Sequence, residues 1–284
     1  MPTLFLCAGL QSSGSTLLSW CFLQRTDMNG VLDADNDLLP VLVPHAQRGM
    51  VWYKTTISCF RPTELIAHFQ DYGWEVRPLL VVRDVRKIWA SLMNKPYARN
   101  GLTAEDPPLR MRLRRFLMDW ELFQQQNWPI LCYEDFLDAP EKSLRQACAE
   151  LKLAWDENML RWPKQAKQIA DAEHGNKTFW ATRGNNLAET LARHVDHFDP
   201  ASIARADWHW LEGEFRAFNV ANNYPLAAPL PDTSKRAAGR ALPSFEVTRR
   251  CDWEIKKRPL RRLLLALGIP NQSPGSRKTI KKVA

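Results

Sequence analysis

The chain has 284 residues, of which 45% are hydrophobic and 25% charged, and its formal net charge is +8 at pH 7. This length can bury a sizeable core, and no uninterrupted apolar run approaches the ~20 residues that a membrane span needs. The six cysteines form no Cys-x-x-Cys pair, which argues against zinc and disulfides and favours reduced thiols. We therefore expect a cytoplasmic protein that requires no metal.

Apolar strand patterns alternate with helical patterns along the first half of the chain. In chain order, the predicted elements are strand 3–9, helix 15–25, strand 50–57, helix 62–72, strand 76–83, helix 85–95, helix 108–127, strand 129–134 and helix 140–152. This alternation predicts an α/β fold with a mostly parallel, doubly wound sheet and right-handed crossovers. Beyond residue 155 the pattern becomes helical, notably from Pro200 to Phe218.

The first predicted strand leads directly into a loop of small residues and then into a helix. Backbone N–H groups of such a loop converge with the first N–H groups of the helix, and the helix dipole favours negative charge there. We therefore expect a bound phosphate group. The residues predicted to contact it are Gln11, Ser12, Ser13, Gly14, Ser15, Thr16 and Leu17.

The same loop lacks the lysine of the nucleotide-triphosphate motif. Gly9 and Gly14 have the spacing of that motif, but Ser15 occupies the lysine position. A grip on β- and γ-phosphates is therefore not expected, and the loop suits a single terminal phosphate better than a triphosphate with magnesium. An ordinary Gly/Ser turn between a strand and a helix is the alternative interpretation.

A second motif begins where another apolar strand ends. The run 79–82 breaks into a helical pattern at Arg83, and Ser91 lies about two helical turns further on. Because ligands of open α/β sheets bind beyond the carboxyl ends of the strands, Arg83 and Ser91 could share one phosphate. A guanidinium fork binds phosphate oxygens in pairs, and a hydroxyl adds a neutral donor. The alternative is a surface ion pair of Arg83 with Asp84 or Glu75.

In this order the two motifs resemble the 5′-phosphosulfate loop and the 3′-phosphate motif of sulfotransferases that use 3′-phosphoadenosine 5′-phosphosulfate (PAPS). The segment 133–136, Tyr-Glu-Asp-Phe, resembles the family's Tyr-Glu-Asp-Leu segment, so the resemblance covers roughly residues 1–155. It implies the P-loop-like sulfotransferase fold, of the bacterial or carbohydrate type rather than the typical cytosolic aryl type. It also implies PAPS as co-substrate and adenosine 3′,5′-bisphosphate as product. Two phosphate sites joined by a nucleoside are what such a nucleotide needs.

Two departures from the family pattern concern catalysis. Many members carry Lys or Arg immediately before the Ser-Gly of the loop, and this chain has Ser12. Lys54 matches the lysine of the family's Lys-Thr-His segment and is the best replacement cation, unless it is a solvated lysine of an edge strand. The histidine that follows in that segment is Thr56 here, and threonine cannot act as a general base.

An acidic stretch offers another base. Carbohydrate-modifying and bacterial relatives take a carboxylate from the stretch after the first helix, and here that stretch holds Asp33, Asp35 and Asp37. Asp33 or Asp35 is the predicted base, provided that it is positioned against the acceptor hydroxyl. The alternative is a solvated acidic loop that caps the next helix. His45 and His68 are weaker candidates for the base.

The second half of the chain holds a loose match to the family's basic Arg/Lys-Gly loop, which returns to the 3′-phosphate. The segment 174–185 breaks the helical pattern with glycine and polar residues. Lys177, Arg183 and Gly184 are the candidates for this contact, and a plain loop is the alternative.

The positive charge is concentrated at the end of the chain, where residues 235–284 hold fourteen Lys or Arg against three Asp or Glu. We therefore expect a sulfotransferase domain at 1–223, with a PAPS-binding core 1–155 and a helical part 156–223. A Pro-rich linker and basic tail would follow at 224–284. The tail could lie on anionic membrane or an acidic polymer, or it is a solvated segment with a short docking helix.

Taken together, these patterns predict transfer of a sulfuryl group from PAPS to a hydroxyl or amine of a small-molecule or carbohydrate acceptor. No nucleic-acid partner is expected. Two other classes of function stay open. A P-loop kinase or nucleotidase would share the fold and the first loop, although the loop lysine is missing. A catalytically inactive nucleotide-binding scaffold is also compatible with Ser12 and Thr56.

Overall fold

The computed structural model describes residues 2–34, 49–56, 61–93, 108–169, 177–194 and 198–226. The strands are β1 (Thr3–Gly9), β2 (Met28–Ala34), β3 (Met50–Thr56), β4 (Glu75–Val82) and β5 (Ile130–Cys132). The helices are α1 (Ser15–Leu23), α2 (Pro62–Asp71), α3 (Val85–Met93), α5 (Pro108–Gln125), α6 (Tyr133–Asp138), α7 (Pro140–Glu150), α8 (Asn158–Arg161), α9 (Lys177–Thr182), α10 (Leu187–Ala192), α11 (Arg205–Glu214) and α12 (Arg216–Ala221), with 3₁₀ turns η1 (Ala166–Gln168) and η2 (Pro200–Ser202).

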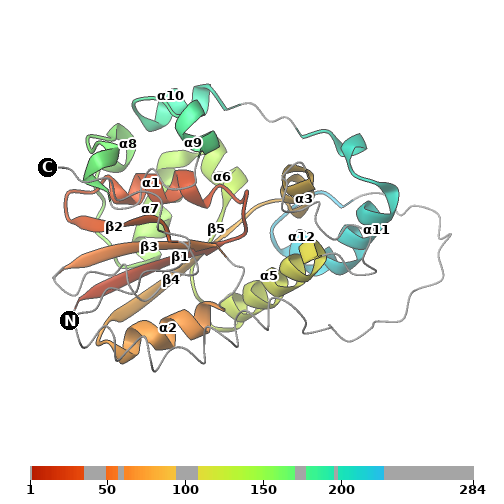
Figure 1. The fold of residues 1–284 in the computed structure, drawn as a ribbon, viewed down its shortest axis with the longest axis horizontal. Helices are drawn as coiled ribbons and strands as arrows, with labels where there is room; N and C mark the ends of the chain where they lie inside the picture. The colour runs from red at the N-terminus through yellow and green to blue at the C-terminus, as the bar shows by residue number, and fades with distance from the viewer. Residues whose placement is uncertain are drawn as a thin grey trace, which may run out of the picture.

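The described strands form one parallel sheet in the order β2-β3-β1-β4-β5 (Figure 1). Gly9 at the end of β1 pairs with Thr56 of β3 on one side and with Val81 of β4 on the other. The carboxyl ends of these strands therefore meet at one edge. After β3 the chain crosses to the other side of β1, so the strand order reverses there, and ligands of open α/β sheets bind at such a reversal. The predicted doubly wound α/β fold is confirmed.

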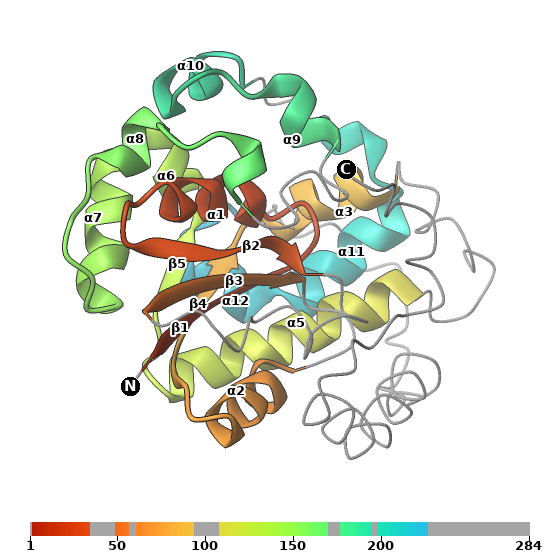
Figure 2. The same cartoon turned by 60° about the vertical axis from the view of Figure 1, so that its left-hand side comes forward.

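One face of the sheet is covered by α1, with α6, α7 and α8 beside it (Figure 2). Alternate strand residues such as Phe5 and Cys7 point to this side because successive side chains of a strand face opposite ways. Phe22 of α1 stacks on Trp52 of β3 with ring centroids 4.1 Å apart and nearly parallel planes. This packing ties the first helix to the middle of the sheet and so sets the direction in which its N-terminus points.

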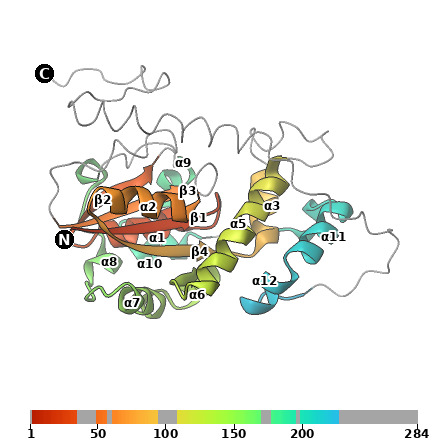
Figure 3. The same cartoon turned by 90° about the horizontal axis from the view of Figure 1, so that it is seen from below.

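The opposite face packs on α2 and α5. Leu4 and Leu6 of β1 lie in one apolar cluster with Tyr53 of β3 and Phe69 of α2. Further along, α5 shares a second cluster with α3, α11 and α12, and these four helices gather to one side of the strands (Figure 3). The segments after β4 and the segments near residue 220 are therefore neighbours in space. None of the helices within the described ranges combines the length and apolar character that crossing a bilayer requires.

The structure contains a strand that the sequence patterns did not reveal. No strand was predicted between residues 25 and 50, yet β2 pairs there with β3. The signal is weak because Gly30 lies inside the strand, where a Cβ would stand 1.9 Å from the Trp52 carbonyl oxygen. Glycine at such a site permits close approach of two backbones while weakening the strand pattern. The helical pattern predicted from Pro200 to Phe218 is divided among η2, α11 and α12.

A buried carboxyl group between α2 and α5 makes the stability of the fold depend on pH. Asp119 is fully buried and accepts a hydrogen bond from Arg61 Nε at 3.0 Å. Burial raises its pKa to about 6, against the opposing effect of Arg61 and Arg115, while Glu64 adds to the rise. The folded state then binds a proton more tightly than the unfolded state does, so stability falls as pH rises from about 4 to about 6.

We expect Asp119→Asn to remove this dependence. At pH 4 the variant and the wild type should be about equally stable, because Asp119 is then protonated. At pH 7 the variant should be the more stable protein by up to about 3 kcal/mol, because the buried charge is gone. Urea unfolding of both proteins at pH 4, 5, 6 and 7 measures the difference. A difference that stays constant over this range would contradict the assignment.

Candidate functional site

The loop between β1 and α1 contains two residues in the left-handed region of backbone conformation. Ser12 has φ 69° and Gly14 has φ 84°, and the N–H of Ser13 donates to the Leu10 carbonyl at 3.1 Å. Gly14 is the N-cap of α1, with no side-chain cap. Left-handed turns of this kind direct successive N–H groups into one concavity, and the start of the helix adds further donors. The loop therefore has the backbone geometry of an anion-binding site.

Gly14 is required by the aromatic ring that covers it. A Cβ at this position would stand 2.1 Å from two ring carbons of Tyr133. Tyr133 begins α6 immediately after β5, so the predicted Tyr-Glu-Asp-Phe segment lies directly against the loop. Within the loop, Ser13 is fully buried and its hydroxyl faces Gly9, where a Cβ would stand 2.7 Å from Ser13 Oγ.

Arg83 and Ser91 meet at Ser12. The guanidinium Nη1 of Arg83 donates to the Ser12 carbonyl at 2.9 Å, and the Ser91 hydroxyl donates to Ser12 Oγ at 2.9 Å. Arg83 follows β4 directly and Ser91 lies on α3, so the strand end and the helix both reach the β1–α1 loop. The surface ion pair with Asp84 or Glu75 is not formed, because these carboxylates pair with Arg86 and Arg77.

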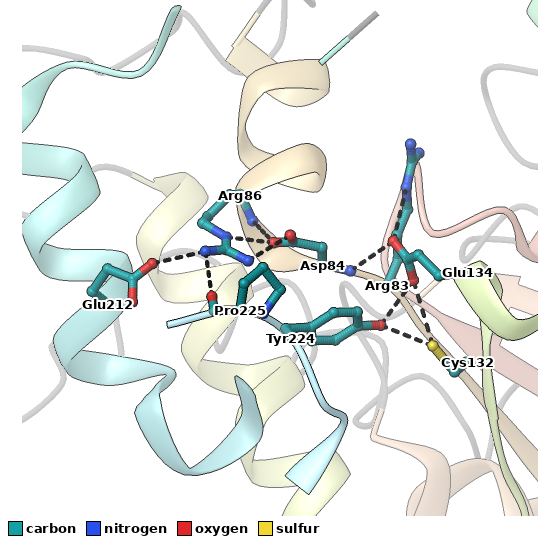
Figure 4. Close-up of polar contacts among 8 residues, drawn as sticks. All are labelled: Arg83, Asp84, Arg86, Cys132, Glu134, Glu212, Tyr224 and Pro225. Carbon is teal, nitrogen blue, oxygen red and sulfur yellow. Dashed lines mark hydrogen bonds and ion pairs between the residues drawn. The ribbon is translucent and has the colours of Figure 1, made fainter. Parts of the chain in front are cut away.

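The Arg83 side chain is enclosed on two further sides. Its guanidinium carbon lies 5.1 Å from the centre of the Tyr133 ring, a cation–π distance. Its Nε lies 3.9 Å from Oε1 of Glu134 (Figure 4). An arginine packed in this way loses little conformational freedom when it binds an anion, and its Nη1 already contacts the loop. The arrangement suits a phosphate group bound against Ser12 and Ser91.

Lys54 lies on an interior strand of the sheet, so it is not a lysine of an edge strand. It is 3% exposed on β3, which pairs with β1 and β2. Trp52 packs under α1 and Tyr53 packs under α2, so the alternation of strand side chains puts Lys54 on the α1 side of the sheet. That is the side on which the β1–α1 loop leads into its helix.

The sequence patterns missed one cation at the loop. Arg112 of α5 donates through Nη1 to Gln11 Oε1 at 3.0 Å, across 101 residues of sequence. Nothing local distinguishes Arg112 from its neighbours Arg110, Arg114 and Arg115 on the same helix. Only the packing of α5 beside the carboxyl edge of the sheet brings this arginine to the loop.

The predicted acidic residues are placed only in part. Asp33 lies near the carboxyl end of β2, where the next residue, Ala34, pairs with Thr55 of β3. The Asp33 backbone is therefore at the same edge of the sheet as Gly9 and Lys54. Asp35, Asp37 and His45 lie outside the described residues, and the identity of the base stays a prediction. His68 is buried on α2 beside Phe69 and Tyr72.

The predicted basic loop is partly a helix. Lys177 begins α9, and Arg183 follows its end. The Arg183 guanidinium lies 4.9 Å from the centre of the Trp180 ring and 5.4 Å from that of Trp20 on α1. The N–H of Gly184 donates to Thr190 Oγ1. These contacts place Arg183 on the α1 side of the sheet, and a role at the 3′-phosphate stays a prediction.

The remaining predicted groups are small or buried. Ser15 and Leu17 are buried in the first turns of α1, and Thr16 is partly exposed between them. The described cysteines are free thiols, and burial raises the pKa of Cys148 to about 11. In the part of the chain that the structure describes, no group of three His, Cys, Asp or Glu could hold a metal ion.

Comparisons with known proteins agree with this architecture. No family model matches the sequence, and no curated protein matches it. Among solved structures, the sulfotransferase domain from the curacin biosynthetic pathway is similar over 80% of this chain and 99% of its own, with TM-score 0.54 and 16% identity.

Two other solved structures are more distant. The sulfotransferase domain of the Synechococcus PCC 7002 olefin synthase has TM-score 0.45 and 15% identity over 68% of this chain and 87% of its own. Mouse sulfotransferase SULT7A1, solved in complex with PAP, has TM-score 0.43 and 13% identity over 77% of this chain and 85% of its own. With its parallel sheet, its β1–α1 loop and its likeness to the curacin domain, the chain has the sulfotransferase fold.

Proposed function

We propose that the protein is a sulfotransferase that uses PAPS and acts on a hydroxyl or amine of a small-molecule or carbohydrate acceptor. The observation that carries the proposal is the meeting of Arg83 and Ser91 at Ser12, on a loop that opens a helix. One strand end and one helix thereby add a guanidinium and a hydroxyl to the backbone donors of the loop. A nucleotide with phosphate groups on both its 5′ and 3′ oxygens matches this donor set.

The donors fit PAPS on chemical grounds. The β1–α1 loop offers N–H groups and the start of a helix, which bind a 5′-phosphosulfate without a metal. The guanidinium of Arg83 can donate two hydrogen bonds to the 3′-phosphate, and the Ser91 hydroxyl can donate another. The small, buried Ser15 in place of a loop lysine favours this nucleotide over a triphosphate. PAPS, when bound, supplies a sulfuryl group on a phosphate that is a good leaving group.

In the proposed reaction the acceptor oxygen or nitrogen forms a bond to sulfur as the bond from sulfur to the phosphate oxygen breaks. Asp33 or Asp35 takes the acceptor proton. Lys54 stabilises the negative charge that develops on the phosphate oxygen, and adenosine 3′,5′-bisphosphate remains in the site. The loop and Arg83 contribute by holding the nucleotide in line with the acceptor.

Calorimetric titration tests the donor assignment directly. The purified protein is titrated with adenosine 3′,5′-bisphosphate and, separately, with adenosine 5′-triphosphate plus magnesium. Micromolar binding of the bisphosphate alone supports the proposal, and an acceptor screen with PAPS then follows. Binding of the triphosphate alone would favour a kinase or nucleotidase. Bisphosphate binding with no turnover on any acceptor would favour an inactive scaffold.

Lys54 should affect the rate of transfer far more than nucleotide binding. We expect Lys54→Met to lower kcat by about 100-fold, because the charge that it stabilises develops only as the bond to sulfur breaks. The affinity for adenosine 3′,5′-bisphosphate should stay within about threefold of wild type. Initial rates with the best acceptor of the screen and calorimetry measure the two quantities. A parallel loss of both would instead assign Lys54 to binding, and Lys54→Arg serves as the charge-preserving control.

A further inference from the structure

Glu134 is the meeting point of four groups from three parts of the chain. Its Oε1 accepts the Asp84 N–H at 3.2 Å and lies 3.9 Å from Arg83 Nε. Its Oε2 accepts the Tyr224 hydroxyl at 2.9 Å and the Cys132 thiol at 3.5 Å. Figure 4 shows the carboxylate between Arg83 and the Tyr224 hydroxyl. Each oxygen of this carboxylate is therefore held in a defined place.

The Tyr224 side of this network is itself anchored. Tyr224, which follows α12 in the chain, is buried, and its ring stacks on that of Phe218 with centroids 5.7 Å apart. The next carbonyl, of Pro225, accepts a hydrogen bond from Arg86 Nη1 at 2.7 Å. Arg86 in turn grips Asp84 with two hydrogen bonds, from Nε and Nη2. The end of β4 and the segment after α12 are thus tied together on either side of Glu134.

The donors to Glu134 keep their protons. Burial raises the pKa of Tyr224, and the negative charge of Glu134 raises it further. Burial likewise raises the pKa of the Cys132 thiol. Tyr224 therefore remains a neutral phenol that donates to the carboxylate, and no second negative charge develops beside it.

The position of the Glu134 carboxylate accounts for the orientation of the Arg83 guanidinium toward the β1–α1 loop. Glu134 lies at the Nε edge of the guanidinium and Tyr133 lies against its face, so the Nη edge is the one that reaches Ser12. We propose that Glu134, held by Tyr224, is a positioning residue that aims Arg83 at the 3′-phosphate. This inference rests on the proposed function. Through Tyr224, the segment after α12 would then contribute to nucleotide recognition.

Whether removal of the Glu134 charge weakens or tightens nucleotide binding distinguishes a positioning role from a purely electrostatic one. A carboxylate beside an anion site repels the anion, so a purely electrostatic neighbour would lower affinity, and its removal would tighten binding. A positioning carboxylate has the opposite effect, because Arg83 without it samples other rotamers and must be ordered when the nucleotide binds. Removing the charge of Glu134 therefore distinguishes the two.

The experiment is a double-mutant cycle between Glu134 and Arg83. Binding of adenosine 3′,5′-bisphosphate and of adenosine 5′-phosphate is measured for wild type, Glu134→Gln, Arg83→Ala and the double variant. We expect Glu134→Gln to weaken the binding of adenosine 3′,5′-bisphosphate by about tenfold. The affinity for adenosine 5′-phosphate should stay within about twofold of wild type. The double variant should bind the bisphosphate as Arg83→Ala does, because Glu134 acts through Arg83.

Further variants keep the test independent of folding. Tyr224→Phe keeps the ring and the Glu134 charge but removes one donor, and we expect about threefold weaker bisphosphate binding with no change for the 5′-phosphate. Glu157→Gln and Tyr72→Phe are the matched controls. Glu157 precedes α8 with its side chain 58% exposed, and Tyr72 lies near the amino end of β4.

Three outcomes would overturn the inference. They are tighter binding of the bisphosphate by Glu134→Gln, equal loss for both nucleotides, and additive losses in the double variant. Each of these can occur while the wild type binds the bisphosphate, in which case the proposed function stands. A wild type that binds no bisphosphate contradicts the proposed function itself, and the inference that rests on it falls with it.

Discussion

Replacing Arg83 with alanine is expected to weaken binding of adenosine 3′,5′-bisphosphate by about 100-fold, because a charged, bidentate contact to phosphate is lost. The affinity for adenosine 5′-phosphate should change much less, since the loop and the start of α1 remain in place. Calorimetry on both nucleotides measures the two effects. Loss confined to the bisphosphate would assign Arg83 to the 3′-phosphate.

Two controls accompany this variant. Arg83→Lys keeps the charge but not the fork, and it should recover only part of the affinity. Arg161→Ala removes an arginine whose side chain is 73% exposed on α8, so nucleotide binding should not change. Bisphosphate binding by Arg83→Ala that equals that of wild type would remove the second phosphate contact from the proposed site.

Gly14→Ala is expected to have the largest effect on the fold and the site together. Alanine at φ 84° costs about 1–2 kcal/mol, and its Cβ would overlap the Tyr133 ring, to which it would stand at 2.1 Å. Tyr133 must then move, and it also packs on Arg83. We expect a total loss of at least about 3 kcal/mol in the free energy of unfolding and no measurable bisphosphate binding. Urea unfolding and calorimetry measure both.

Substitutions of two other glycines distinguish the cost of backbone strain from the cost of the clash with Tyr133. Gly73 has φ 80°, but a Cβ there would meet no atom within 4 Å. Gly73→Ala should therefore cost only the backbone term of about 1–2 kcal/mol. A Cβ at Gly213 on α11 also meets nothing within 4 Å, so Gly213→Ala should stabilise the protein by about 0.5–1 kcal/mol. Equal losses of the free energy of unfolding for Gly14→Ala and Gly73→Ala would show that the Tyr133 ring moves away from the added Cβ at no energetic cost.

The local elements of the site follow from the sequence because they depend on short-range patterns. A strand at 3–9, a small-residue loop and a helix at 15–25 are predicted, and β1 (Thr3–Gly9) and α1 (Ser15–Leu23) are present there. The strand that ends before Arg83 was likewise predicted within a residue at each end. Turn residues and the period of apolar side chains determine such elements, whatever the rest of the chain does.

Two local elements, β2 and α9, were not predicted because their sequence patterns are ambiguous. β2 contains Gly30 and an acidic residue, which suggest a loop, and it becomes a strand because β3 is beside it. The segment 174–185 suggested a loop because of its glycines, yet α9 forms within it, with Trp180 packed against Trp20 of α1. In both cases tertiary contacts outweigh weak local preference.

What the sequence by itself determined is the alternation of strands and helices that predicts an α/β fold, and the two motifs predicted to bind phosphate, since each depends on neighbouring residues. The tertiary structure alone decided which distant side chains complete the site. Arg112 reaches Gln11 across 101 residues, and Tyr224 reaches Glu134 across 90. Such contacts depend on how α5 and α12 pack beyond the carboxyl edge of the sheet, and no local period encodes that packing.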